Sequence, residues 1–274
     1  MNNFLLRTIT GLVYVVVIIG SLLLGAKVFA SLFFIINLLT LNEFLTNIKR
    51  IRLPSLNLYF GIASGAVLYL LITLTGLGYL PPTLLSIALV IPLSLFAREL
   101  FAKNQSPITN IAISTLGLIY ITIPFALLVT LYPTPQSSDP FPWNILALFV
   151  IVWINDTFSY LTGITFGRNL LFKRISPKKT WEGTIGGFLS SLAGGFVMYK
   201  VSSGYSMILW IILSGLISIS ALIGDLSESV IKRSLNIKDS GNLLPGHGGL
   251  LDRFDSLLFA TPVVYVFITL LGKL

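Results

Sequence analysis

Residues 225–256 read DLSESVIKRSLNIKDSGNLLPGHGGLLDRFDS, and this polar stretch interrupts a chain that is otherwise mostly apolar. The stretch holds five of the ten acidic residues and the only histidine, His247. Its basic residues are Lys232, Arg233, Lys238 and Arg253. Charges this dense between two long hydrophobic runs are costly unless they meet water, a metal ion or a charged ligand. We therefore predict that the working site lies in this stretch.

The composition predicts a polytopic helical membrane protein. Of the 274 residues, 55% are hydrophobic and 10% are charged, with a mean hydropathy of +0.91, whereas a soluble domain has about 25% charged residues. The chain has no cysteine, which excludes disulfides and thiolate metal sites. We assign the net charge of +8 to basic loops that face an anionic membrane surface and an anionic substrate, rather than to nucleic acid.

Apolar runs long enough to cross a bilayer, about 17–25 residues each, recur along the whole chain and predict an all-α fold of about nine transmembrane helices. The predicted spans are 8–26, 28–48, 57–77, 79–97, 107–131, 142–163, 183–200, 205–224 and 256–273. Proline inside the fourth and fifth spans, at Pro92 and Pro124, weakens those two predictions, although neighbouring helices in a membrane can satisfy the freed carbonyl groups.

The basic residues predict the orientation of these spans. With the N-terminus in the cytoplasm, the inner segments hold fifteen Lys and Arg residues and the outer segments hold three. Such a bias is typical of cytoplasmic loops. It places the charged segments 164–182 and 225–255 on the cytoplasmic side, where nucleotides are available. We expect an integral protein of the cytoplasmic (inner) membrane with its active site facing the cytoplasm.

The acidic residues predict that the chemistry lies in the second half of the chain, since seven of the ten follow residue 150. We expect residues 1–131 to form a transmembrane scaffold and residues 132–274 to form the catalytic region, within one integral membrane unit. The sequence does not decide the oligomeric state, and a homodimer is one option.

The first candidate constellation begins at Asp156, inside the sixth predicted span. On a helix Asp156, Ser159, Tyr160, Gly163 and Gly167 share one face. An acid within a membrane span is a candidate functional residue. The small residues also allow a neighbouring helix to approach closely, so a helix-packing seam is the alternative interpretation.

The second constellation is Ser176-Pro-Lys178-Lys179-Thr-Trp-Glu182-Gly. Serine and proline disfavour a helix, so we expect the lysine pair in a loop ahead of the seventh span. A lysine pair beside a glycine-rich helix start can hold phosphate, although an ordinary cytoplasmic loop would also be basic. The chain has no Walker A pattern, so any nucleotide site is not a P-loop.

The third constellation lies in the opening stretch. Asp225 and Glu228 share a helical face, and Asp252 and Asp255 form a second pair three residues apart at the start of the last span. Carboxylates that converge repel one another unless a cation lies between them. Oxygen ligands favour Mg²⁺, which uses one or two carboxylates together with substrate phosphates.

Glycines flank His247, at positions 246, 248 and 249, and predict a tight turn in which backbone can approach a ligand. His247 could bind phosphate, act as an acid or base, or only form hydrogen bonds within the turn. Two other acids need no catalytic role: snorkelling or a helix–helix hydrogen bond explains Glu43, and Arg98-Glu99 is typical of an interfacial pair.

A family resemblance follows from these residues. Residues 229–255, with Lys232-Arg233, Lys238-Asp239-Ser-Gly, Pro245-Gly-His-Gly-Gly and Asp252-Arg-Phe-Asp255, resemble the full signature of the phosphatidate cytidylyltransferases, without a departure. The segments 155–168 and 175–183 resemble other polar segments of that family. The resemblance implies that CTP and phosphatidic acid give CDP-diacylglycerol and pyrophosphate, that Mg²⁺ is required, and that the lipid bilayer supplies one substrate.

We predict three sets of site residues on this basis. The catalytic set is Asp225, Lys232, Arg233, Lys238, Asp239, His247, Asp252, Arg253 and Asp255. The substrate-binding set is Asp156, Ser159, Tyr160, Ser176, Lys178, Lys179, Glu182, Gly248 and Gly249. The metal ligands are Asp225, Asp252 and Asp255, with a second cation beside Mg²⁺ left open.

Two other functions remain open from the sequence. A CTP-dependent polyprenol or dolichol kinase would transfer the γ-phosphate of CTP to a lipid alcohol. An ion-coupled transporter would use Asp156 and Asp225 as ion ligands near broken helices, although no inverted repeat is visible. The spacing of Asp252 and Asp255 differs from the Asp-x-x-x-Asp pattern of CDP-alcohol phosphotransferases.

Overall fold

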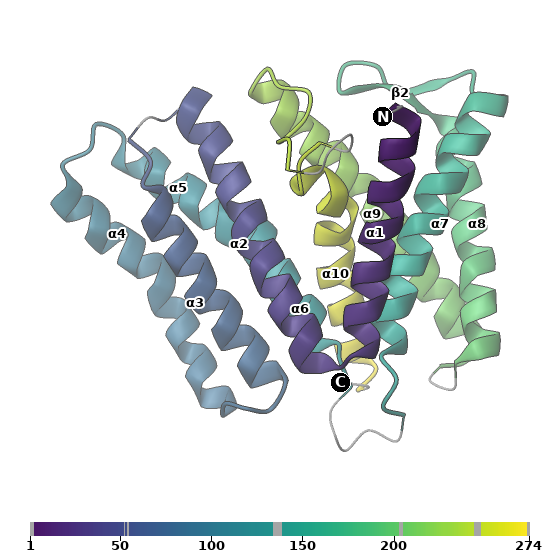
Figure 1. Cartoon of the computed structure of the whole chain (residues 1–274), viewed down its shortest axis with the longest axis horizontal. Helices are drawn as coiled ribbons and strands as arrows, with labels where there is room; N and C mark the ends of the chain where they lie inside the picture. The colour runs from purple at the N-terminus through teal and green to yellow at the C-terminus, as the bar shows by residue number, and fades with distance from the viewer. Residues whose placement is uncertain are drawn as a thin grey trace. The chain divides into compact units, whose positions relative to one another are not determined.

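The structure is a computed structural model that describes residues 3–51, 53, 55–133, 139–202, 205–243 and 248–272. Helices form most of it, and one short hairpin of strands joins two of them (Figure 1). In chain order the elements are α1 (Asn3–Leu23), α2 (Ala26–Ile51), α3 (Leu58–Gly76), the 3₁₀ helix η1 (Pro82–Leu89), α4 (Val90–Ala102), α5 (Pro107–Gly117), the π-helical turn η2 (Leu118–Thr122), α6 (Ile123–Thr130), α7 (Trp143–Phe166), β1 (Leu170–Phe172), β2 (Ser176–Thr180), α8 (Trp181–Val201), α9 (Met207–Ser234) and α10 (Leu251–Leu270).

The helices confirm a multi-pass membrane protein. Among the described residues, seven helical segments are long and apolar enough to cross a bilayer, and Thr8–Leu23 is a shorter apolar helix. Helix α8 is not among the seven, because its five glycines and two serines lower its hydropathy. The count of nine spans and the cytoplasmic N-terminus stay predictions.

The polar stretch is more helical than the sequence predicts. Helix α9 continues to Ser234 instead of ending at residue 224, and α10 begins at Leu251 instead of 256. The Glu228–Lys232 ion pair, four residues apart, stabilises the added turns of α9. This geometry confirms the shared helical face of Asp225 and Glu228, and the loop between the helices is shorter than expected.

Proline explains how the predicted fifth span differs from a regular helix. The segment from Pro107 to Thr130 consists of α5, the wide turn η2 and α6. Pro124 lies just after η2, and its missing N–H and its ring disturb the hydrogen bonds of the preceding turn. The predicted fourth span is likewise divided into η1 and α4, and Pro92 lies in the first turn of α4.

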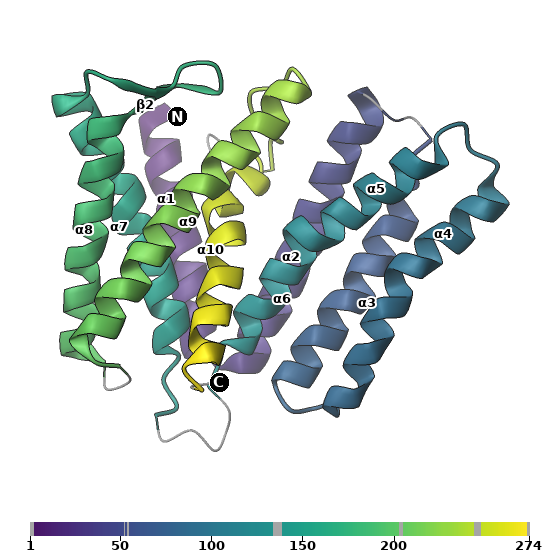
Figure 2. The same ribbon diagram turned by 180° about the vertical axis from the view of Figure 1, so that it is seen from behind.

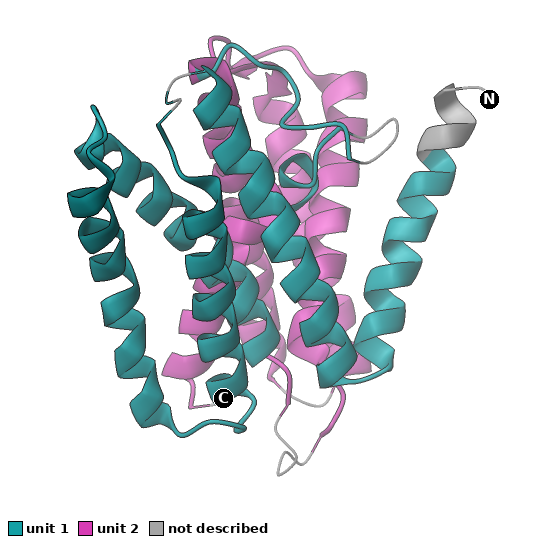
Figure 3. Ribbon diagram, turned by 60° about the vertical axis from the view of Figure 1, so that its left-hand side comes forward, with its two compact units in different colours: residues 1–130, 235–254 teal, residues 131–234, 255–274 magenta. Residues whose placement is uncertain are grey.

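The chain forms two compact units, which Figure 3 shows in different colours. Unit 1 contains residues 1–130 and 235–254, so it combines the first half of the chain with part of the polar stretch. Its core includes the ring cluster of Phe33, Phe125 and Phe254, with centroids 5.3–5.9 Å apart. Phe254, in the first turn of α10, thereby anchors that helix start in the core of unit 1.

Unit 2 contains residues 131–234 and 255–274. Helix α8 packs against both α7 and α9 (Figure 2). The hairpin of β1 and β2 connects α7 to α8 and is antiparallel, with Leu170 opposite Thr180 and Phe172 opposite Ser176. The division at residue 131 into scaffold and catalytic region stays a prediction.

Candidate active site

Three aspartates from three helices of unit 2 come together. Asp255 of α10 interacts electrostatically with Asp225 of α9 and with Asp156 of α7, and all three charges have the same sign. Asp225 and Asp255 are partly buried, and Asp156 is exposed. Gly224, just before Asp225, lets α9 lie against the backbone of α10, because a Cβ there would overlap the carbonyl oxygen of Asp255. We call Asp156, Asp225 and Asp255 the acid cluster.

Lys179 supplies the opposite charge. Its ammonium group forms an ion pair with Asp225, in which 26% of the lysine side chain and 32% of the aspartate side chain are exposed. It also interacts favourably with Asp255. The expected loop at Lys178 and Lys179 is wrong, because both lysines lie in strand β2. Since successive side chains of a strand point to opposite faces, Lys179 reaches the acid cluster while Lys178 is exposed.

Glu182 holds the base of the hairpin. Its carboxylate accepts hydrogen bonds from the backbone N–H groups of Arg168 (3.1 Å) and Asn169 (3.2 Å) and from the side-chain amide of Asn169 (2.7 Å). Hydrogen bonds from its own backbone N–H and from that of Arg168 lower the pKa of Glu182 to about 2. The carboxylate therefore ties the end of α7 to the start of α8, while its predicted contact with substrate stays a prediction.

The small residues of α7 form a packing seam with α8, which was the alternative interpretation of their spacing. A Cβ at Gly187 would overlap Ser159 Oγ, and a Cβ at Gly183 would lie 2.7 Å from the Ser159 carbonyl oxygen and 3.1 Å from the Cα of Gly163. Ser159 therefore lies against α8, whereas Tyr160, at 67% exposure, does not. Their predicted roles in substrate binding stay predictions.

Asn155 positions the acid beside it. Its side-chain oxygen accepts a 2.6 Å hydrogen bond from Ser218 of α9, and its amide nitrogen lies 3.3 Å from Asp156 Oδ1. Asn155 is 7% exposed. Sequence reasoning missed this hydrogen bond between α7 and α9. The pattern that would have indicated it is an asparagine next to an acid within an apolar run.

The C-terminal turn of α9 places its two basic residues differently. Lys232 pairs with Glu228, which is 1% exposed. Arg233 is exposed, and its Nε donates a 3.5 Å hydrogen bond to the carbonyl oxygen of Ile175 in the hairpin turn. Arg233 and the lysines of β2 therefore belong to one basic region of unit 2, beside the acid cluster.

In unit 1, Asp252 organises the loop that precedes it. Its Oδ2 accepts hydrogen bonds from the backbone N–H of Ser240 (2.9 Å), the hydroxyl of Ser240 (3.0 Å) and the backbone N–H of Gly249 (2.8 Å). Gly248 has a φ of +83°, a conformation that favours glycine. The role of Asp252 as a metal ligand stays a prediction. These hydrogen bonds show that it also stabilises the loop at Ser240 and Gly249.

Four other predicted residues lie in or beside this loop. Lys238, Asp239 and Arg253 are exposed. His247, with residues 244–246, lies outside the described residues, so its role stays a prediction.

Glu43 is the site residue that sequence reasoning assigned to snorkelling or helix packing. Its carboxylate, from α2, accepts hydrogen bonds from the hydroxyl of Ser240 and from the backbone N–H groups of Leu250 (3.1 Å) and Leu251 (3.2 Å). The spacing of residues along α2 could not reveal this, because its partners lie about two hundred positions later in the chain.

A magnesium site at the acid cluster stays a prediction, and the oxygen ligands there are of the kind that Mg²⁺ prefers. Across the residues that the structure describes, there is no metal-holding group of three Asp, Glu or His side chains. Mg²⁺ does not need one, because it usually binds one or two carboxylates, several waters and substrate phosphates. Repulsion among three carboxylates, which Lys179 partly offsets, provides the local charge that a divalent cation would neutralise.

Comparison with known proteins identifies the family of the chain. Residues 5–271 match the model of the cytidylyltransferase family. The chain belongs to this family.

Members of the cytidylyltransferase family from several bacteria align with most of the chain. A phosphatidate cytidylyltransferase of Staphylococcus haemolyticus (strain JCSC1435) is 32% identical over 262 residues, which cover 95% of this chain and 97% of that protein. The enzymes of the same name from Rickettsia bellii (strain RML369-C) and Staphylococcus aureus (strain COL) are 37% and 33% identical, over 76% and 95% of this chain and 90% and 97% of theirs. The resemblance inferred from residues 229–255 is confirmed.

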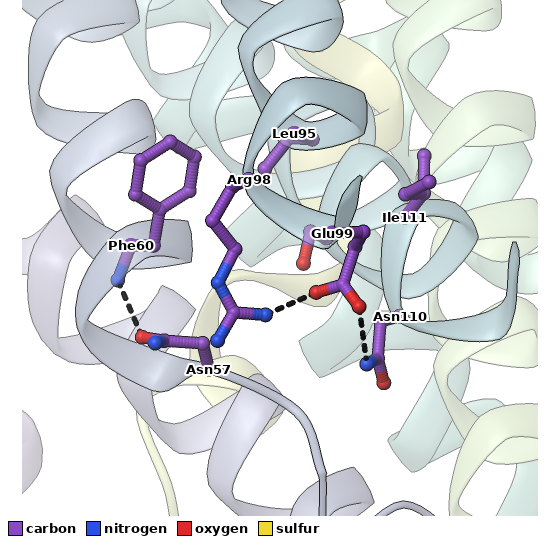
Figure 4. Close-up of a pocket in the computed structure, with 8 residues that line it drawn as sticks. Asn57, Phe60, Leu95, Arg98, Glu99, Asn110 and Ile111 are labelled. Atoms are coloured by element: carbon purple, nitrogen blue, oxygen red, sulfur yellow. Dashed lines mark hydrogen bonds and ion pairs between the residues drawn. The ribbon is translucent and has the colours of Figure 1, made fainter. Parts of the chain in front are cut away.

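None of the predicted site residues lines a small pocket in unit 1. The pocket contains the ion pair of Arg98 and Glu99 (Figure 4). Glu99 is 8% exposed and also accepts hydrogen bonds from Asn104 (2.8 Å) and Asn110 (3.0 Å). The predicted pair is therefore present as an ion pair with its acid buried in a polar network, and its place at the membrane interface stays a prediction.

Proposed function

We propose that this chain is a phosphatidate cytidylyltransferase, which forms CDP-diacylglycerol and pyrophosphate from CTP and phosphatidic acid. The observation that carries the proposal is the acid cluster with Lys179, at the positions where the family resemblance expects phosphate and metal chemistry. The whole-length similarity to enzymes of that name supports the choice of substrates.

The reaction needs little base catalysis. The second pKa of a phosphomonoester is near 6, so the phosphate of phosphatidic acid is largely a dianion at neutral pH. One of its oxygens attacks the α-phosphorus of CTP in line. A new P–O bond forms, the bond to the β-phosphate breaks, and pyrophosphate leaves. The task of the protein is therefore to align the two substrates and to neutralise their charges.

The residues of unit 2 have the charges for this task. Asp225 and Asp255 would hold Mg²⁺, and Asp156 would complete the polar surface near them. A bound Mg²⁺ would supply charge neutralisation on the transferring and leaving oxygens. Lys179, which pairs with Asp225, has the charge to bind a phosphate of CTP. Arg233 and Lys178 lie in the same basic region and would bind the other phosphate oxygens.

The loop of unit 1 carries other charged residues that the family resemblance assigns to the nucleotide. Lys238 and Asp239 are exposed beside Ser240, which Asp252 holds through two hydrogen bonds. Asp252 stays a predicted metal ligand. Arg253 would neutralise phosphate. We place this site at the cytoplasmic side of the bacterial inner membrane, because the basic residues that would bind CTP are also those that the positive-inside rule assigns to the cytoplasm.

The direct test uses purified protein, phosphatidic acid, radiolabelled CTP and Mg²⁺, with EDTA in a parallel reaction. We expect label in a lipid product only when both phosphatidic acid and free Mg²⁺ are present. A lipid product that forms equally well in excess EDTA would contradict the metal assignment. Flux of an ion or solute in proteoliposomes without CTP would instead support a transporter.

A further inference from the structure

Glu43 places a negative charge at the N-terminal end of a helix to which it does not belong. Two backbone N–H groups at the start of α10, those of Leu250 just before the helix and of Leu251 at its first position, donate to its carboxylate at 3.1 and 3.2 Å. The first N–H groups of a helix have no partner within the helix, and the helix dipole favours an anion there. Glu43 of α2 therefore supplies the cap that α10 lacks in its own sequence.

The same carboxylate holds the loop ahead of α10. The hydroxyl of Ser240 lies within hydrogen-bond distance of both Glu43 Oε1 and Asp252 Oδ2. Asn47, one turn after Glu43 on α2, donates its side-chain amide to the carbonyl oxygen of Ser240. Ser240 is only 3% exposed, so the backbone next to the exposed Lys238 and Asp239 is fixed from two sides.

Two glycines show how closely the loop approaches Glu43. A Cβ at Gly241 or at Gly249 would overlap the carboxylate of Glu43, and one at Gly249 would also overlap Ser240 Oγ. Neither glycine has a positive φ, so the conformation of the backbone does not require glycine at these positions. Glycine is required at both positions because the Glu43 carboxylate occupies the space that a Cβ would take.

We infer that Glu43 is a positioning residue for cytidylyl transfer. It holds residues 240 and 249–251 in place, and through them it orients Lys238, Asp239 and Asp252 toward CTP without touching the substrate itself. This inference rests on the proposed function.

The decisive variant is Glu43→Gln, which keeps the shape of the side chain and removes its charge and one of its two acceptor oxygens. The matched control is Glu99→Gln, which changes a second hydrogen-bonded glutamate of unit 1, itself buried, that has no contact with the loop in the described structure. We expect the KM for CTP to rise about 10- to 100-fold in Glu43→Gln, the usual range for residues that support a first layer of ligands. The KM for phosphatidic acid should stay close to that of the wild type.

A role limited to general stability would give another result. Partial unfolding lowers the fraction of active enzyme, so kcat would fall while both KM values stayed unchanged, in Glu43→Gln as in Glu99→Gln. That result, or an unchanged KM for CTP in an active Glu43→Gln enzyme, would overturn the inference. If Glu43→Gln does not accumulate in the membrane, Ser240→Ala replaces it. The KM for CTP should rise in that variant too, and an unchanged value would contradict the inference.

Hydrogen exchange separates this inference from the proposed function. The backbone amides of Leu250 and Leu251 should exchange faster in Glu43→Gln than in the wild type, whatever reaction the protein catalyses. Equal exchange rates would contradict the contact itself. A wild-type protein that forms no CDP-lipid, with faster exchange in the variant, would instead contradict the proposed function alone.

Discussion

Asp255 is repelled by two other carboxylates, those of Asp156 and Asp225, and attracted by the ammonium group of Lys179. The sequence predicted its importance through the family signature and through its spacing from Asp252. The helix spacing could not show that Asp156, about a hundred positions earlier, would join it. Such a pairing depends on how α7 and α10 pack within unit 2, and no local pattern encodes that.

Asp255→Asn should lower kcat by at least about 10²–10³-fold, the loss seen when one group that stabilises transition-state charge is removed. The amide retains the size of the side chain but binds a divalent cation weakly. The rate of lipid labelling from CTP measures the effect, and the amount of protein extracted from the membrane reports folding.

Asp139→Asn is the control for this variant. Asp139 is another hydrogen-bonded aspartate of unit 2, which accepts from the backbone N–H of Phe141 and from the indole of Trp143. It should keep near-normal activity. An Asp255→Asn enzyme that turns over like the Asp139→Asn control would remove Asp255 from the metal site.

At the scale of single elements, the strand β2 is the feature that the sequence concealed. Ser176-Pro177 correctly excluded a helix, but a five-residue strand that contains proline and two lysines has no clear strand pattern. The strand decides that Lys179, and not Lys178, pairs with Asp225. By contrast, the face of α9 that carries Asp225 and Glu228 was predictable, because the helical period applies wherever the helix continues.

The seam between α7 and α8 gives a prediction on stability. Gly187→Ala should lower the free energy of unfolding by about 1–3 kcal/mol, the usual cost of overpacking, because the added Cβ overlaps Ser159 Oγ and lies 2.8 Å from the Asn155 carbonyl oxygen. Thermal unfolding in detergent measures the loss.

Gly215→Ala is the matched substitution in α9. Its Cβ would meet the nearest atoms at 3.5 Å, an ordinary contact, so this variant should be as stable as the wild type or more stable, since alanine favours the helix. Equal stability of the Gly187 and Gly215 variants would contradict the close approach of α7 and α8.

The hairpin gives a prediction on pH. Folding lowers the pKa of Glu182 from 4.5 to about 2, so its ionised carboxylate stabilises the folded state fully above pH 4.5. That contribution is lost as the pH falls toward 2. Glu182→Gln should therefore be less stable than the wild type at neutral pH, and the difference between the two should disappear between about pH 4.5 and pH 2.

Thermal unfolding across this pH range, or the exchange rates of the Arg168 and Asn169 amides, measures the difference. If the difference in stability between wild type and Glu182→Gln grows on acidification, the hydrogen bonds to the ionised carboxylate are absent.

At the scale of the whole molecule, the sequence predicted the class of protein and most helix positions, because long apolar runs have a direct physical meaning in a membrane. It did not predict that residues 235–254 belong to the same compact unit as the first half of the chain. That assignment depends on Phe254 in an aromatic core and on Glu43 at the start of α10, which are contacts between distant segments.

The predicted orientation can be tested because the natural chain has no cysteine. Lys173→Cys lies in the exposed turn of the hairpin, and Lys200→Cys is exposed near the other end of α8. In intact cells a membrane-impermeant maleimide should label Lys200→Cys and should leave Lys173→Cys unlabelled until the membrane is opened. The reverse pattern would place the hairpin and its lysines outside the cytoplasm.

The central claim is that cytidine monophosphate passes from CTP to the phosphate of the lipid. The most direct measurement supplies the purified protein with phosphatidic acid and Mg²⁺, and with CTP labelled with ³²P at either the α or the γ position. We predict that the α label enters the lipid product and that the γ label leaves as pyrophosphate. Entry of the γ label into the lipid, with release of CDP, would contradict the account and identify a lipid kinase.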